Sequence, residues 1–432
     1  MAKVNTRDLV VEILLLVTRD GQYSHIALNQ VLGKYQYLDK SDRAFITRVV
    51  EGTLERMIEL DYITDQFSKV KVKKMKPVIQ AIIRSAVYQL KYMDSVPDRA
   101  VCSEAVKLAV SRGFGGLRGF VNGVLRSIAR NLDTVSYPEE GTLEHLSVAY
   151  SMPRWILEQW LSVYSLEQVE RMLQDFLQEK PTSIRCNLHQ ISRKELKEKL
   201  TREGVKAEEV PELPCALLIS GYDYLAALPS FQEGDFQVQD ISSMLVARRA
   251  DPKEGAYVID VCAAPGGKAL HLADMLAGTG MVEARDISDY KVELIWDNIR
   301  RSGMDNIRAV RWDATVLDEE SVEKADIVIA DLPCSGLGVL GRKSDLKYRM
   351  TPESEAELAS LQRKMLSVVW RYVKPGGKLV YSTCTINREE NEENAAWFQA
   401  EHPDFRLVSE EQLLPGQQAG DGFYIAVFVR KD

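Results

Sequence analysis

The chain has 432 residues, of which 45% are hydrophobic and 27% charged, and its formal net charge is −8. This length favours two or three domains, and the composition is that of a globular protein. The sequence contains no apolar run near the roughly 18 residues of a membrane span, and its first segment lacks a secretory cleavage site. We therefore expect a cytoplasmic protein without a membrane anchor.

The charge is unevenly distributed along the chain. The net charge is +7 through Val135 and −15 beyond it. A basic end on an acidic chain permits RNA contact on one face, although chance asymmetry of solvated faces explains the same numbers equally well. Five lysines between Lys69 and Lys76 form a local positive patch, for which a solvated loop is the simpler interpretation.

The cysteines argue against both disulfides and a metal site. They are scattered, with no CxxC motif and no Cys/His cluster, which disfavours a disulfide framework and a structural zinc site. Free thiols fit a reducing cytoplasm. The six are Cys102, Cys186, Cys215, Cys262, Cys334 and Cys384.

Residues 1–135 form the first predicted domain, which we expect to be all-helical. Apolar residues recur there at intervals of three and four, which places them on one face of a helix. The predicted helices cover residues 9–17, 44–54, 78–90, 100–110 and 120–128. The segment from Asp133 to Gly141 contains Pro138 and is typical of a linker.

Residues 142–235 form a second region with a mixed pattern. Its first part, 142–180, is predicted to be helical. Strand patterns at 181–188 and 216–219 then flank a helical pattern at 193–203. We therefore expect a helical linker followed by a small α+β insert.

Strands and helices alternate in the third predicted domain, residues 236–432. This alternation predicts an α/β fold with a doubly wound, mostly parallel sheet of the Rossmann-like type. A late strand at 423–429 is expected at the antiparallel edge. The other predicted strands cover 257–262, 281–286, 308–312, 327–330 and 378–382, and the clearest helices cover 269–276, 290–302 and 353–373.

The first strand of this domain runs into a turn of small residues, Cys262 to Lys268, and then into a helix. Small residues let the backbone approach a ligand at the carboxyl edge of the sheet. The turn is not a phosphate loop, because neither GxGxxG nor GxxxxGK[ST] is present.

Two aspartates strengthen the prediction of a cofactor pocket at this turn. Asp286 ends the next strand, where an acidic side chain can bind a ribose hydroxyl. Asp313 follows the third strand, in a position suited to an adenine amino group. Each aspartate alone fits a turn or a helix cap. Their place at successive strand ends favours the cofactor pocket.

Two further strand ends carry cysteines, in Asp331-Leu332-Pro333-Cys334-Ser335-Gly336 and Tyr381-Ser382-Thr383-Cys384-Thr385. A cysteine at a strand end is commonly a small core residue, but a pair beside a methyl-donor pocket suits methylation of cytosine at carbon 5. That carbon becomes nucleophilic only after a thiolate adds to C6, and a base must later remove the C5 proton. Nearby cations or helix amino ends must favour the thiolate. The pattern alone does not decide between Cys334 and Cys384.

These segments resemble the RNA cytosine-5 methyltransferase family. The resemblance covers residues 142–432 and is carried by Asp260 to Lys268, Asp331 to Gly336 and Ser382 to Thr385. Flanking motifs lie at Phe236 to Ser243 and Gly420 to Ala426.

The resemblance implies a role for each of the residues at the strand ends. Cys384 would be the nucleophile, Asp331 would hold the base, Cys334 would assist product release, and Lys268 would be counted among the catalytic residues. At Ala269, where the family often has a hydroxyl residue, we expect at most a lost cap or backbone contact. The residues that would bind S-adenosyl-L-methionine are Cys262, Ala263, Ala264, Pro265, Gly266, Gly267, Lys268, Asp286, Asp313 and Asp331.

The N-terminal part is similar to the NusB RNA-binding fold, through Ala100 to Lys107 and Gly119 to Arg126. A NusB-like domain joined to this methyltransferase domain resembles the bacterial family that methylates one cytosine of 16S ribosomal RNA. The insert would be its RNA-recognition-like element. The resemblance implies 16S ribosomal RNA, naked or in an early small-subunit precursor, as the partner, and we expect a monomer.

Two alternatives compete with this interpretation. A transfer RNA cytosine-5 methyltransferase would share the catalytic motifs, but the NusB-like domain disfavours it. A NusB-like antitermination factor with a decayed methyltransferase domain is disfavoured by the intact Asp331, Cys334, Cys384 and glycine turn.

Overall fold

The computed structural model describes residues 4–35 and 37–432, which divide into two compact units. The first unit extends to Leu177 and also includes Leu340–Arg349. The second comprises Gln178–Val339 and Met350–Asp432. The expected domain boundaries at 135 and 235 stay predictions.

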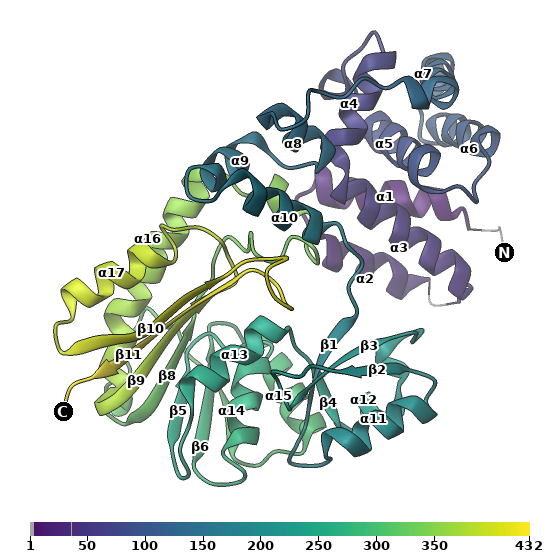
Figure 1. Cartoon of the computed structure of the whole chain (residues 1–432). Helices are drawn as coiled ribbons and strands as arrows, with labels where there is room; N and C mark the ends of the chain where they lie inside the picture. Colours follow the sequence, from purple (N-terminus) through teal and green to yellow (C-terminus); the bar gives the residue numbers. More distant parts are fainter. Residues whose placement is uncertain (1–3, 36) are drawn as a thin grey trace. The chain divides into compact units, whose positions relative to one another are not determined.

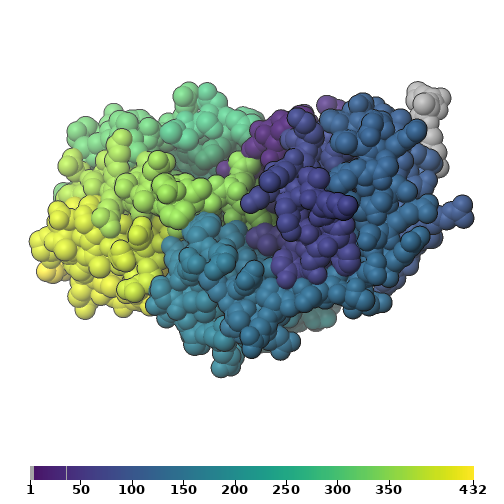
Figure 2. Space-filling model, turned by 90° about the horizontal axis from the view of Figure 1, so that it is seen from above, coloured from purple at the N-terminus to yellow at the C-terminus, as the bar shows by residue number. Residues whose placement is uncertain are grey.

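The first unit is helical, as the spacing of its apolar residues predicts (Figure 1). Those residues pack into one core that includes Ile13, Ile46 and Ile83. Figure 2 shows the outer surface of this unit in purple and blue. Its helices are α1 (Thr6–Thr18), α2 (Ser24–Lys34), α3 (Lys40–Glu55), α4 (Met57–Phe67), α5 (Pro77–Tyr92), α6 (Asp98–Ser111), α7 (Arg118–Asn131), α8 (Leu143–Ala149), α9 (Arg154–Leu161) and α10 (Leu166–Phe176).

Residues 340–349 pack into this helical unit, although they follow the strand end that carries Cys334. The Asp345 carboxylate accepts hydrogen bonds from the N–H (3.1 Å) and the hydroxyl (2.7 Å) of Ser24. The Lys347 ammonium donates to the Glu55 carbonyl over 2.8 Å. Residues 340–349 therefore belong to the helical unit.

The second unit contains two sheets (Figure 1). The smaller sheet has the order β2-β3-β1-β4, and its neighbouring strands pair antiparallel. Together with its helices it confirms the expected α+β insert. Its elements are β1 (Thr182–Cys186), α11 (Arg193–Arg202), β2 (Lys206–Glu209), β3 (Ala216–Ser220), α12 (Pro229–Gln232) and β4 (Phe236–Val238).

The larger sheet has the order β10-β11-β9-β8-β5-β6-β7. The strands from β9 to β7 pair in parallel, which confirms the Rossmann-like fold. Strand β11 pairs antiparallel on both sides, so its expected place at the edge is wrong; β10 lies outside it. The strands are β5 (Tyr257–Asp260), β6 (Met281–Asp286), β7 (Ile307–Arg311), β8 (Ala325–Asp331), β9 (Val373–Thr383), β10 (Phe405–Leu413) and β11 (Phe423–Arg430).

Helices cover both faces of this sheet. Successive strand residues point to opposite faces, so the apolar side chains of these strands lie on both faces and are buried by helices on each side. Val258 and Ala284 pack on the face with residues of α14 and α15, and Ile259 and Val328 pack on the face with residues of α16 and α17. The helices are α13 (Ile241–Ala250), α14 (Gly267–Met275), α15 (Asp289–Ser302), α16 (Pro352–Val369) and α17 (Glu392–Glu401).

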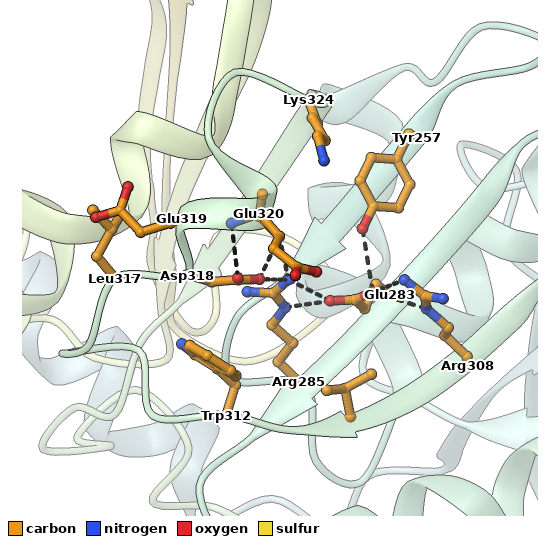
Figure 3. Close-up of a pocket in the computed structure, with 12 residues that line it drawn as sticks. Tyr257, Glu283, Arg285, Arg308, Trp312, Leu317, Asp318, Glu319, Glu320 and Lys324 are labelled. Carbon is orange, nitrogen blue, oxygen red and sulfur yellow. Dashed lines mark hydrogen bonds and ion pairs between the residues drawn. The ribbon is translucent and has the colours of Figure 1, made fainter.

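The connection from β7 to β8 contains a short 3₁₀ turn, Glu319–Ser321, in place of an α-helix. Charged side chains therefore lie where a helix would pack (Figure 3). Glu283 accepts hydrogen bonds from Arg285 and Arg308, and Arg285 also reaches Asp318 at 2.8 Å. They line a cavity of about 810 Å³.

Candidate active site

The turn after β5 brings backbone close to the carboxyl edge of the sheet. The Ala263 N–H donates to the Arg285 carbonyl (2.8 Å), and the Ala264 N–H donates to Asp286 Oδ2 (3.1 Å). Gly266 has a φ of +106°, which an L-side chain rarely adopts, and α14 begins at the next residue. These bonds hold the small-residue turn against the end of β6, as the cofactor prediction requires.

Asp286 and Asp313 lie at the predicted strand ends but differ in their surroundings. Asp286 is buried, and its Oδ1 accepts from the Ile287 N–H (2.8 Å) and pairs with Lys291 (3.1 Å). Asp313 accepts the N–H and the hydroxyl of Thr315, both at 2.8 Å, and the N–H bond in particular lowers the pKa of its carboxyl. Asp313 thus makes the local turn contact that its sequence also allowed.

Asp260, the last residue of β5, is buried without a side-chain partner. The residue is 1% exposed, and no described side chain hydrogen-bonds to either of its carboxyl oxygens. Burial raises its pKa to about 7, and the nearby charge of Asp331 adds to the effect. The backbone N–H of Cys262 lies near and favours the charged form. An orphaned carboxyl beside a glycine turn suits a cationic group of a ligand.

Asp331 connects the cofactor turn to the cysteines. Lys268 donates to its Oδ2 over 2.7 Å, and the Ser382 hydroxyl donates to its Oδ1 over 2.8 Å. Burial is the largest single influence on Lys268 and opposes its charge, but Asp331, together with Asp260 and Cys384, outweighs burial and raises the pKa of the ammonium. The Lys268 nitrogen also lies 5.2 Å from the centre of the Phe423 ring, which favours a cation. The carboxylate and the ammonium therefore fix one another.

The two predicted cysteines meet at the ends of β8 and β9. Their sulfur atoms are 3.3 Å apart, and the Cys384 N–H points at Cys334 Sγ over the same distance. The hydrogen bond with Cys384, followed by burial, raises the pKa of the Cys334 thiol well above its ordinary value. Either sulfur can be the donor in this contact, and the raised pKa favours the protonated form of Cys334.

Cys262, another of the predicted residues, contributes little reactivity. Burial raises the pKa of its thiol, so the thiol stays protonated and unreactive. Sequence reasoning missed Ser382 and Lys291 as partners of the predicted aspartates, and it left Asp260 without a role. The one sequence signal that could have identified Asp260 as a site residue is its position as a charged residue at the end of a buried strand.

The described part of the chain contains neither a candidate metal site nor a candidate membrane-spanning helix. Within 4–35 and 37–432, no group of three or more His, Cys, Asp or Glu side chains has the arrangement to hold a metal ion. No described helix is both long enough and apolar enough to cross a membrane.

The sheet, its glycine turn and the helical unit define a Rossmann-like methyltransferase joined to a NusB-like domain. The sequence matches the family described as 16S rRNA methyltransferase RsmB/F over residues 247–429. It also matches the NusB family over 4–130 and the RsmF/B-like ferredoxin-like domain over 152–222.

The chain belongs to the ribosomal RNA small subunit methyltransferase B family. It is 37% identical to the probable ribosomal RNA small subunit methyltransferase B of Bacillus subtilis, with 100% of each chain covered. It is 30% identical to the corresponding Klebsiella pneumoniae protein, with 99% of each covered. The crystal structure of PH0851 aligns over 99% of each chain with a TM-score of 0.83 and 25% identity.

Proposed function

We propose that this protein transfers a methyl group from S-adenosyl-L-methionine to carbon 5 of a cytosine in 16S ribosomal RNA, through a covalent bond between Cys384 and carbon 6. The names of its relatives and its NusB-like domain support ribosomal over transfer RNA. The observation that carries the covalent mechanism is the pair of sulfur atoms 3.3 Å apart at the ends of β8 and β9.

The groups at the carboxyl edge of the sheet suit the methyl donor. The turn after β5 is made of small residues, Asp260 offers a buried carboxyl without a side-chain partner, and Asp286 lies at the end of β6. Asp286 would hold the ribose hydroxyls and Asp313 the adenine amino group. When bound, the donor supplies an electrophilic methyl group.

The two thiols take different parts in the reaction. Cys384 adds to C6 as a thiolate, stabilised by the Cys334 S–H and by the nearby Lys268 ammonium. Asp331, fixed by Lys268 and Ser382, binds the amino edge of the base. After methylation a general base removes the proton from C5. The electrons of the C5–H bond re-form the C5=C6 double bond as the C6–S bond to Cys384 breaks. Cys334 assists this release.

A denaturing gel of full-length variants with ribosomal RNA and labelled donor tests the two roles. Cys384→Ala removes the nucleophile, so we expect neither methyl transfer nor a covalent complex. Cys334→Ala still permits addition and methylation but impairs elimination, so we expect a slow, RNase-sensitive band that is absent in the double variant.

Cys102→Ala is the matched control, because Cys102 is a buried cysteine of the helical unit. It leaves a small cavity that lowers stability, and turnover stays intact. The reverse band pattern would exchange the two roles. Activity retained in both variants without a band would remove the covalent mechanism, and methylation of transfer RNA in place of ribosomal RNA would overturn the substrate.

A further inference from the structure

One buried carboxyl, Glu390, lies between the two segments that carry the cysteines. Glu390 is 0% exposed, and no cation in the described part of the chain pairs with it. Its Oε2 is 2.9 Å from the Ser335 N–H donor, and its Oε1 contacts the Ser335 hydroxyl. The residue that follows Cys334 is thereby held at two atoms.

The same contacts extend to the Cys384 segment and to α16. The Ser335 and Thr385 hydroxyl oxygens are 2.6 Å apart, and Thr385 follows Cys384. Gln362 of α16 donates to Glu390 Oε2 and to the Pro333 carbonyl, both over 2.9 Å. Glu390 therefore links Ser335 and, through Ser335, Thr385, which are the residues that follow the two cysteines. Gln362 connects this network to Pro333, the residue before Cys334.

We propose that Glu390 is a positioning residue that keeps the Cys334 and Cys384 segments in register. It deepens the proposed two-cysteine mechanism and rests on it. Glu390 contacts neither sulfur atom; it acts through Ser335 and Thr385. Buried polar groups with complete hydrogen bonding fix one arrangement of the segments that they join.

Glu390 acts through hydrogen bonds, and its negative charge is not required. Burial raises the pKa of its carboxyl. The Ser335 hydroxyl donates to Oε1, and Oε2 accepts from the Ser335 N–H and the Gln362 amide. In a glutamine the amide oxygen keeps the acceptor role of Oε2. Its amide nitrogen, at the position of Oε1, can donate to the Ser335 hydroxyl, whose hydrogen then turns to Thr385. Alanine leaves these buried partners unsatisfied.

Steady-state kinetics of full-length Glu390→Ala and Glu390→Gln test this role. For alanine we expect kcat to fall about 100-fold, the cost of misplacing reacting groups by about 1 Å, with KM for RNA and donor within a few-fold of the parent. For glutamine we expect kcat to recover to within a few-fold. Glu283→Gln is the matched control, because Glu283 is a buried carboxyl of the same unit whose hydrogen bonds come from Tyr257, Arg285 and Arg308. Its kcat should not change at temperatures where the variant is folded.

The second readout measures the register of the two thiols without RNA. Diamide takes two electrons and two protons from a close dithiol, so it should form a Cys334–Cys384 disulfide at least about tenfold more slowly in Glu390→Ala than in the parent or Glu390→Gln. Unchanged kcat and unchanged disulfide formation in a folded Glu390→Ala would overturn the proposal, as would a glutamine variant as defective as alanine. Activity retained in Cys384→Ala would instead overturn the proposed function.

Discussion

At the scale of single residues, the buried carboxyl group of Asp260 couples the stability of the fold to ligand binding. A buried carboxyl without partners favours its neutral form, and burial raises the pKa of Asp260 to about 7 against an ordinary 3.8. The folded chain therefore keeps a proton between about pH 4 and pH 7 that the unfolded chain has lost. Between these two pH values the ionisation of Asp260 lowers the free energy of unfolding as the pH rises. Above about pH 7 this loss of stability has reached its full size.

A cationic ligand beside Asp260 should favour its ionised form. We expect the affinity for S-adenosyl-L-methionine, measured by titration calorimetry, to increase with pH up to about 7 and then to level off. The ionisation of this one group can change the affinity by at most about tenfold per pH unit. Asp260→Asn should remove that rise and retain only the titration of the donor itself. An equal slope in the parent and the variant would contradict this role for Asp260.

The residues at strand ends were predictable because parallel strands carry ligands at their carboxyl ends. That rule placed Asp286, Asp331, Cys334 and Cys384 together, and the structure has Cys334 and Cys384 in contact. The partners of these residues were not predictable. Ser382 lies 51 residues from Asp331 along the chain, and no local periodicity states which distant hydroxyl meets a carboxylate.

At the scale of elements, the 3₁₀ turn between β7 and β8 explains the buried charges on the sheet. Because no helix covers this part of the face, Arg285 and Glu283, each 3% exposed, pair with one another (Figure 3). The Arg285 guanidinium also lies over the rings of Trp312 and Tyr372. The ion network takes the place of an apolar helix contact.

Removing one partner of this network should be costly. Glu283→Gln leaves Arg285 buried with reduced compensation, so we expect a loss of about 3 kcal/mol in the free energy of unfolding, measured with urea. Glu319→Gln, an exposed residue of the same cavity, should change it by no more than about 0.5 kcal/mol. Equal small effects of both substitutions would show that the network contributes little.

Strong periodicity made most elements predictable, and weak periodicity hid the rest. The five N-terminal helices and the parallel strands had clear apolar spacing, and each is present. Helix α2 buries only Ala27, Leu28 and Val31, so its apolar face is narrow. Strand β10 is largely exposed at the sheet edge, and its run of polar residues concealed it and shifted the expected edge to β11.

At the scale of the whole molecule, the helical unit includes more than its N-terminal sequence. Helices α8 to α10 and residues 340–349 belong to the same compact unit, and Asp345 is buried there by its bonds to Ser24. No pattern in the sequence indicated that ten residues after the Cys334 segment pack with helices that precede them by some 300 positions. Deleting residues 1–132 would therefore expose buried groups, and surface substitutions are the cleaner test of RNA binding.

The lysine run at residues 69–76 of the helical unit is the surface whose substitution tests RNA binding. Val72 and Met75 are buried and anchor it, whereas its five lysines are exposed, so the segment is a fixed basic surface. Neutralising Lys73, Lys74 and Lys76 to glutamine should remove up to three phosphate contacts. We expect the slope of log affinity against log salt to lose about 2 to 3 units, at about 0.7 to 0.9 per contact.

Fluorescence anisotropy with ribosomal RNA at several KCl concentrations measures that slope, and kinetics at moderate salt should show a raised KM for RNA with kcat unchanged. The matched control neutralises three exposed lysines of the second unit, Lys194, Lys253 and Lys324, which leaves the net charge of the whole protein equal to that of the test variant. Because both variants lose three positive charges, a difference between them reports the position of the lysines and not the total charge. Equal slopes in the two variants would mean that the lysine run faces solvent in the RNA complex, and that the basic character of the N-terminal sequence serves solubility alone.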